Sequence, residues 1–167
     1  MTEEVIVVNE QNEVIGSLPR NVAAKQHAIV RIVCVLVYNT KGNIILSQHS
    51  KTKASNALKW NWSAGGHLDA GEEIESGALR ELKEELGING KIEFLMAITK
   101  SINKDTGKLK AFIYTFKVIH DGPYILDKRE HESHKEYTSA KLSKLLQNNP
   151  EMFSPSFITF VKQMGNL

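Results

Sequence analysis

Three glutamates lie at positions whose spacing suits metal chemistry. Glu81, Glu84 and Glu85 fall within residues 74–86, a segment expected to be helical. Each residue turns an α-helix by about 100°, so the three carboxylates share a wedge of about 100°. Like charges at this spacing repel one another, and a hard cation such as Mg²⁺ or Mn²⁺ relieves the repulsion while it engages phosphates. We therefore expect a metal site here, and the alternative is a solvated acidic face.

The same segment has a second face that is apolar. Ala78, Leu79, Leu82 and Leu86 fall in an adjoining wedge, so the helix can bury one side while its acidic flank stays polar. Gly87 follows the last apolar residue, and a glycine in this place is typical of a left-handed cap that ends a helix.

The spacing of these residues extends over a longer pattern. Residues 66–88 match G-x5-E-x7-R-E-U-x-E-E-x-G-U, where U is aliphatic, at every position, from Gly66 through Glu72 and Arg80 to Gly87 and Ile88. The segment resembles the Nudix box. The resemblance implies a Mg²⁺- or Mn²⁺-dependent hydrolase that cleaves a diphosphate linked to another group, usually in a nucleoside diphosphate derivative. It also implies an α/β/α sandwich fold.

The resemblance also implies roles for individual residues. Metal ligands are expected to be Glu81, Glu84, Glu85 and the carbonyl of Gly65, and the first three are also catalytic candidates. Arg80 is expected to hold a catalytic glutamate in place, and Glu72 to support the preceding loop through hydrogen bonds. Which glutamate acts as the general base stays open.

Many relatives carry a further acidic residue just before the last strand. Glu132 and Glu136 are the candidates here, and we favour Glu132 as a catalytic residue over the alternative of a charged, solvated loop. The order His131-Glu132-x-His134 does not give the i, i+4 histidines of a zinc protease.

The rest of the chain is similar to the isopentenyl-diphosphate isomerase-like branch of the Nudix superfamily. Two departures separate it from true isomerases: Gly65 stands where they carry an acid/base cysteine, and Val30 stands where a histidine is common. We therefore expect a hydrolase. An isomerase-like protein and a non-catalytic nucleotide-binding or regulatory Nudix module are the alternatives.

Basic and aromatic residues outside the box are candidates for substrate contacts. Arg20 and Lys53 are expected to meet the diphosphate as point charges, and each is otherwise a simple exposed residue. His67 is a substrate contact or a hydrogen-bonded loop residue. We expect Trp60 to pack in the core. For Trp62, core packing and stacking on a base of the substrate both stay open.

Length and composition favour a single globular domain over residues 1–167 that acts on a small molecule. The net charge of +2 gives no support to a nucleic-acid partner, and the 41% hydrophobic content is ordinary. Cys34 is the one cysteine, so it cannot form an intrachain disulfide, and we expect it to be buried. No apolar stretch suits a membrane span, so a cytoplasmic monomer or homodimer is the expectation.

The elements that must position the box belong to an α/β fold with a mixed sheet. Residues 1–20 are expected to form an N-terminal β-hairpin from 5–8 and 14–18. Further strands are expected at 29–38, 44–46, 60–64, 91–102, 109–119 and 135–138, and helices at 74–86, 139–147 and 156–164. The strand at 29–38 is apolar enough to be buried on both faces. The box helix and the C-terminal helices are expected on opposite sides of the sheet.

Overall fold

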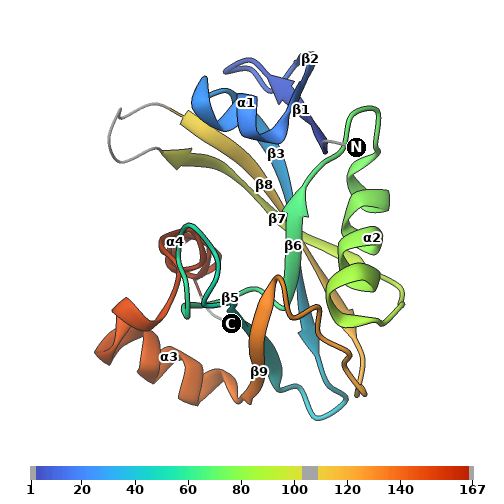
Figure 1. Ribbon diagram of the computed structural model, residues 1–167. Helices are drawn as coiled ribbons and strands as arrows, with labels where there is room; N and C mark the ends of the chain where they lie inside the picture. The colour runs from blue at the N-terminus through green and yellow to red at the C-terminus, as the bar shows by residue number, and fades with distance from the viewer. Residues whose placement is uncertain (1–2, 103–108, 166–167) are drawn as a thin grey trace.

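The computed structural model describes residues 3–102 and 109–165 and has the expected α/β architecture (Figure 1). The strands are β1 (Glu4–Val8), β2 (Val14–Pro19), β3 (Ile29–Tyr38), β4 (Ile44–His49), β5 (Trp60–Asn61), β6 (Ala64–His67), β7 (Glu93–Ile102), β8 (Leu109–Ile119) and β9 (His131–Tyr137). The helices are α1 (Arg20–Lys25), α2 (Ile74–Leu86), α3 (Ser139–Asn148) and α4 (Pro155–Met164), with a 3₁₀ turn at Pro150–Met152.

Strand β3 is the centre of the sheet. It pairs antiparallel with β1, β4 and β6 and parallel with β8, so the sheet is mixed as predicted. Val33, Val35 and Val37 pack on one face of β3, and Cys34 and Leu36 pack on the other. Successive side chains of a strand point to opposite faces, so this apolar run is buried on both sides.

Helices cover the two faces of the sheet, and Figure 1 shows α2 on one side and α3 and α4 on the other. Leu82 and Leu86 of α2 are fully buried in one core cluster, and Phe157 and Phe160 of α4 are fully buried in the other. Burying one such side chain contributes roughly 1.5–3 kcal/mol. The predicted sandwich is confirmed, and apolar contact fixes α2 against the sheet.

The limits of α2 agree with the sequence pattern. The helix spans Ile74–Leu86, and Gly87 adopts a left-handed conformation with φ 68° as its C-cap. The hairpin β1–β2 extends the sheet, because β1 pairs with both β2 and β3. Trp60 is buried and packs edge-on against Tyr137 with ring centroids 5.7 Å apart, so the expected core role of Trp60 is confirmed.

Several predicted elements differ from the structure: the strand expected at 60–64 is divided into β5 and β6, and β4 continues beyond residue 46 to His49. Helix α1 was not predicted, and β9 begins at His131 rather than at residue 135 because its first residues pair with β4. The turn expected at residues 104–107 lies outside the described residues, although β7 and β8 do pair antiparallel. In the part of the chain that the structure describes, no helix is long and apolar enough to cross a membrane.

Candidate active site

A cavity of about 930 Å³ lies beside the box helix and receives residues from several elements. Eight of the nine predicted site residues line it: Arg20, Lys53, Gly65, His67, Arg80, Glu81, Glu84 and Glu85. Trp62 is buried and lines it as well, packing edge-on against Phe157. The fold therefore gathers residues that are distant in the sequence around one hollow.

Arg80 connects the acidic residues of the box. Its guanidinium donates two hydrogen bonds of 2.9 Å to the two carboxylate oxygens of Glu72. It also donates to Glu81 at 2.8 Å, to Glu84 at 3.3 Å and to the carbonyl of His67 at 3.1 Å. Hydrogen bonds to Glu72 raise the pKa of Arg80 despite partial burial. Arg80 thus has the geometry to hold two of the three metal-ligand candidates.

Glu72 links the helix to the loop before it. Its Oε2 accepts a hydrogen bond from the backbone N–H of Asp69 at 3.1 Å. Burial acts to raise the pKa of Glu72, but the bonds from Arg80 and from Asp69 outweigh burial and lower it. Glu72 therefore stays charged at neutral pH and braces the loop that leads into α2.

Glu81 is the carboxyl whose charge is least compensated. It is 7% exposed, and burial followed by the negative charge of Glu85 raises its pKa to about 7, although Arg80 acts in the opposite direction. The backbone of Gly66 lies close to it, since a Cβ at that position would stand 2.2 Å from Glu81 Oε1. Glycine is required there because any side chain would displace the carboxyl.

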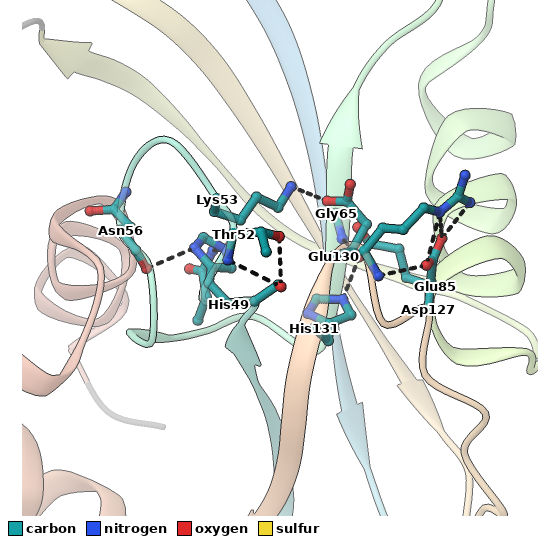
Figure 2. Close-up of polar contacts among 12 residues, drawn as sticks. His49, Thr52, Lys53, Asn56, Gly65, Glu85, Asp127, Glu130 and His131 are labelled. Carbon is teal, nitrogen blue, oxygen red and sulfur yellow. Dashed lines mark hydrogen bonds and ion pairs between the residues drawn. The ribbon is translucent and has the colours of Figure 1, made fainter.

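Glu85 is held from two directions at one oxygen. Glu85 Oε2 accepts a hydrogen bond of 2.8 Å from the backbone N–H of Gly65 and lies 3.0 Å from His131 Nε2. Figure 2 shows the ring of His131 directed at this carboxylate. Both Glu85 and His131 are 4% exposed. Glu85 is therefore anchored to the sheet, whereas Glu84 has a side chain that is 59% exposed.

The three carboxylates have the right chemistry for a hard divalent cation, which takes oxygen ligands. Within residues 3–102 and 109–165, however, no three acidic, histidine or cysteine side chains converge as a ready-made metal cluster. The reason is visible in their hydrogen bonds: Glu81 and Glu84 face Arg80, and Glu85 faces Gly65 and His131. The carboxylate oxygens fit such an ion. Burial and the charge of Glu85 raise the pKa of Glu81 although Arg80 acts in the opposite direction, so Arg80 alone does not offset them.

Three cations on the other walls of the cavity are each paired with a carboxylate that also lines it. Arg20 contacts Glu3 at 2.9 Å, Lys53 contacts Glu130, and Arg129 contacts Asp127 at 2.6 Å. Figure 2 shows the Lys53–Glu130 pair reaching across from the loop after β4 to the start of β9. A substrate anion must therefore compete with resident carboxylates.

His49 is fixed as a neutral ring at the floor of the cavity. Its Nε2 lies 2.8 Å from the side-chain amide nitrogen of Asn61, and its Nδ1 lies 3.2 Å from the carbonyl of Asn56. The amide donates and the carbonyl accepts, so the hydrogen is on Nδ1. Burial and then Lys53 lower the pKa of His49. His49 thus supplies no positive charge to the cavity at neutral pH.

Glu132, favoured from the sequence, is the one predicted site residue that does not line the cavity. It is exposed on β9, and its side chain lies 3.5 Å from the backbone nitrogen of Lys51. Glu136 is also exposed and bonds to Asn43. The register of β9 against β4 shifts at Glu132, so that Gln48 pairs with Ser133 and His49 with His131, and Glu132 is left without a partner among the described residues of β4.

Sequence reasoning missed three residues that the structure brings to the site. Asp127, Glu130 and His131 all line the cavity and follow one another before and at the start of β9. The sequence pattern predicts the last strand four residues later, at 135–138, and so leaves His131 outside it. A correct start at His131 would have assigned its inward direction.

Comparisons with known proteins agree with this geometry. The profile of the NUDIX domain matches residues 28–157, which is most of the chain. The chain belongs to the NUDIX domain family. An uncharacterised Nudix hydrolase of Pseudomonas aeruginosa is 37% identical over 86 residues, which cover 52% of this chain and 51% of that protein. The chain thus spans about half the length of that relative.

Two further comparisons cover nearly the whole NUDIX chain. An isopentenyl-diphosphate Δ-isomerase of Serratia proteamaculans is 25% identical over 166 residues, covering 99% of this chain and 93% of that protein. A crystal structure of a Deinococcus radiodurans protein superposes with a TM-score of 0.80 at 21% identity, covering 97% and 99% of the two chains. The predicted family and the fold class are confirmed, and the expected isomerase-like relatives are among the matches.

The buried charge of Glu81 predicts a pH-dependent stability. Its pKa rises from 4.5 to about 7 on folding. The folded state therefore holds this proton more tightly, and stability is lost as the pH rises through about 7. Glu81→Gln removes that penalty, so in buffer with EDTA its Tm should exceed that of the unsubstituted protein by a few degrees at pH 8 (roughly 2–4 °C per kcal/mol), with little difference at pH 4.5.

Glu75→Gln, an exposed change in the first turn of the same helix, is the matched control and should shift Tm little at both pH values. Calorimetry or thermal circular dichroism measures both. A lower Tm for Glu81→Gln at pH 8 would show that its contact with Arg80 outweighs burial.

Proposed function

We propose that this chain is a divalent-metal-dependent diphosphohydrolase that cleaves the diphosphate linkage of a nucleoside diphosphate derivative or a related small metabolite. The observation that carries the proposal is the opposition of charges across one cavity: Glu81, Glu84 and Glu85 line one wall, and Lys53 and Arg20 line others. The oxygens of a diphosphate bound between these walls contact Lys53 and Arg20. The carboxylates of the other wall bind the metal ion.

The proposed metal ligands are Glu81, Glu84, Glu85 and the carbonyl of Gly65. A bound Mg²⁺ or Mn²⁺ neutralises phosphate oxygens and makes a coordinated water more acidic. The residues of the chain do the rest: Arg80 orients two carboxylates, and Gly65 N–H and His131 hold the third. A carboxylate takes a proton from the attacking water, whose oxygen forms a bond to phosphorus as the bridging P–O bond breaks.

Geometry favours Glu130 over Glu132 as the late acidic residue of the site. Glu130 lines the cavity and pairs with Lys53, which comes from a loop 77 residues away in the sequence. A substrate phosphate that takes Lys53 leaves the Glu130 carboxylate free to accept a proton or to approach the metal. We therefore assign the catalytic role expected of Glu132 to Glu130.

The isomerase alternative is weakened by the backbone at Gly65. A Cβ there would lie 2.6 Å from Val33 O and 3.0 Å from Cys34 Cα, so the position has no room for a cysteine without a shift of the strands. Cys34 itself is buried as expected, and burial followed by the charge of Glu85 raises the pKa of its thiol. The chain therefore offers no thiol poised for acid/base chemistry at the place where isomerases carry theirs.

A non-catalytic binding module is the second alternative. The NUDIX domain of NrtR from Shewanella oneidensis has been solved with ADP ribose, at 16% identity and a TM-score of 0.60. That likeness shows a shared fold. All box carboxylates are retained in this chain, and Glu81, Glu84 and Glu85 line the cavity, which favours turnover over binding alone.

Formation of the two phosphomonoester products, or of pyrophosphate from a triphosphate, followed by ion-exchange chromatography, tests the hydrolase directly. The screen covers nucleoside diphosphate sugars and alcohols, dinucleotides, ADP ribose and deoxynucleoside triphosphates, each with Mg²⁺ or with EDTA. Glu84→Gln is the sharpest variant, because Glu84 is exposed and contributes one contact of 3.3 Å to Arg80. We expect kcat to fall by about 100-fold or more with an unchanged Tm.

Glu75→Gln is the control on the same helix and should leave kcat unchanged. Tight binding of one compound by the unsubstituted protein, without turnover of any, would favour the non-catalytic module. Full activity of Glu84→Gln would remove Glu84 from the metal site.

Lys53 should bind the diphosphate in the ground state as well as in the transition state. Lys53→Gln should therefore raise KM by about 10- to 100-fold, as expected for loss of a charged hydrogen bond, with kcat changed little. Lys51→Gln is the matched control, because Lys51 is exposed in the same loop and does not line the cavity. Equal KM values for the two variants would contradict the assignment.

The two late glutamates form a natural matched pair. Glu130→Gln should lower kcat by more than about 10-fold, in the range of general acid/base contributions. Glu132→Gln should stay within about twofold of the unsubstituted enzyme, because Glu132 does not line the cavity. Steady-state kinetics at saturating substrate measures both, and the reverse order would restore Glu132 as the catalytic residue.

A further inference from the structure

His131 is buried in a strand whose following residues are mostly polar and exposed. It is 4% exposed, whereas Glu132, His134 and Glu136 of the same strand are exposed. A histidine with this burial is held by specific partners or is misplaced. Its partner is known: Nε2 lies 3.0 Å from Glu85 Oε2, and a carboxylate oxygen accepts, so the hydrogen is on Nε2.

Main-chain hydrogen bonds reinforce the contact between His131 and Glu85. Asp127 N–H donates to the carbonyl of Glu85 at 3.0 Å, and His131 N–H donates to the carbonyl of Asp127 at 2.8 Å. The segment that carries His131 is therefore tied to the end of α2 by main-chain bonds as well as by the ring. Figure 2 shows His131, Asp127 and Glu85 gathered at this junction.

The hydrogen bonds of the Glu85 carboxylate are unequally divided between its two oxygens. Oε2 receives both donors, Gly65 N–H at 2.8 Å and His131 Nε2–H at 3.0 Å. Within the described residues Oε1 has no hydrogen-bond partner, and Glu85 lines the cavity. Two donors on one oxygen fix the plane of the carboxylate more firmly than one, and they leave the other oxygen available.

We propose that His131 is a positioning residue that orients Glu85 for the divalent cation. The inference rests on the proposed function, because it concerns the same carboxylate site. His131 acts through Glu85 and not on the substrate. Partners of this kind, which hold a metal-binding side chain without touching the metal, typically change metal affinity or activity by about 10- to 100-fold when removed.

Three substitutions separate the hydrogen bond from simple packing. His131→Gln places an amide N–H near the position of Nε2, His131→Asn has an amide that is too short to reach, and His131→Leu fills space without a donor. His134→Gln is the control on the same strand, at an exposed position whose ring packs on Tyr124.

The first readout needs no metal. Exchange of the Gly65 amide hydrogen, followed by NMR in EDTA, reports whether Glu85 keeps its place, because Gly65 N–H donates to Glu85. We expect His131→Asn and His131→Leu to accelerate this exchange by at least about tenfold and His131→Gln to restore most of the protection. The Ser63 amide, bonded to the carbonyl of Val35, should be unaffected.

The second readout is Mn²⁺ affinity, measured by calorimetry or electron paramagnetic resonance without substrate. His131→Asn and His131→Leu should bind Mn²⁺ about 10- to 100-fold more weakly, with His131→Gln close to the unsubstituted protein, and kcat should follow while KM changes little. Equal behaviour of all three variants, or unchanged affinity in His131→Leu, would overturn the positioning role alone. Absence of Mn²⁺ binding by the unsubstituted protein would overturn the role and the proposed function together.

Discussion

The repulsion among acidic side chains of the box is the interaction on which the rest of the site depends. Glu72, Glu81 and Glu84 all contact one guanidinium, that of Arg80. One positive charge cannot neutralise three carboxylates, and burial, followed by the negative charge of Glu85, raises the pKa of Glu81 to about 7. Removing one partner of a buried charge pair typically costs about 3–5 kcal/mol, so Arg80 has a structural as well as a functional reason to be present.

This charge arrangement requires close packing behind it. Helix α2 must approach β6 so nearly that Gly66 has no room for a side chain beside Glu81. The apolar residues of α2 and the buried strand β3 supply the energy that holds the helix there, since Leu82 and Leu86 are fully buried. Burial of the apolar face of α2 therefore holds the glutamates of its acidic face close together. A bound cation would reduce the repulsion between them.

The charges on the other walls of the cavity are neutralised in pairs. Lys53 and Glu130 neutralise each other, as do Arg129 and Asp127. The Lys53–Glu130 pair joins the loop after β4 to the connection between β8 and β9, and the Arg129–Asp127 pair lies within that connection. Loops and connections are the parts of a fold that differ most easily without disturbing the sheet. The box wall is acidic, whereas the walls built by these segments carry Lys53 and Arg129 beside carboxylates.

The sequence alone determined the parts of the protein that depend on local spacing. The limits of α2, its left-handed cap at Gly87 and the double burial of β3 follow from periodicity over neighbouring residues, whereas the placement of helices on both faces followed from the family resemblance. The box pattern fixed which carboxylates gather, because residues three and four apart must share one side of a helix. The family followed from the same residues.

Only the tertiary structure decided which distant residues complete the site. Glu132 was a reasonable candidate by position, but β9 starts at His131, and the cavity is lined by His131 and by Glu130, which precedes the strand, and not by Glu132. The pairing of β9 with β4 includes a register shift at His49 that no local pattern reveals. A one-residue slip reverses every side chain of a strand, so long-range hydrogen bonding, not composition, placed the last residues of the site.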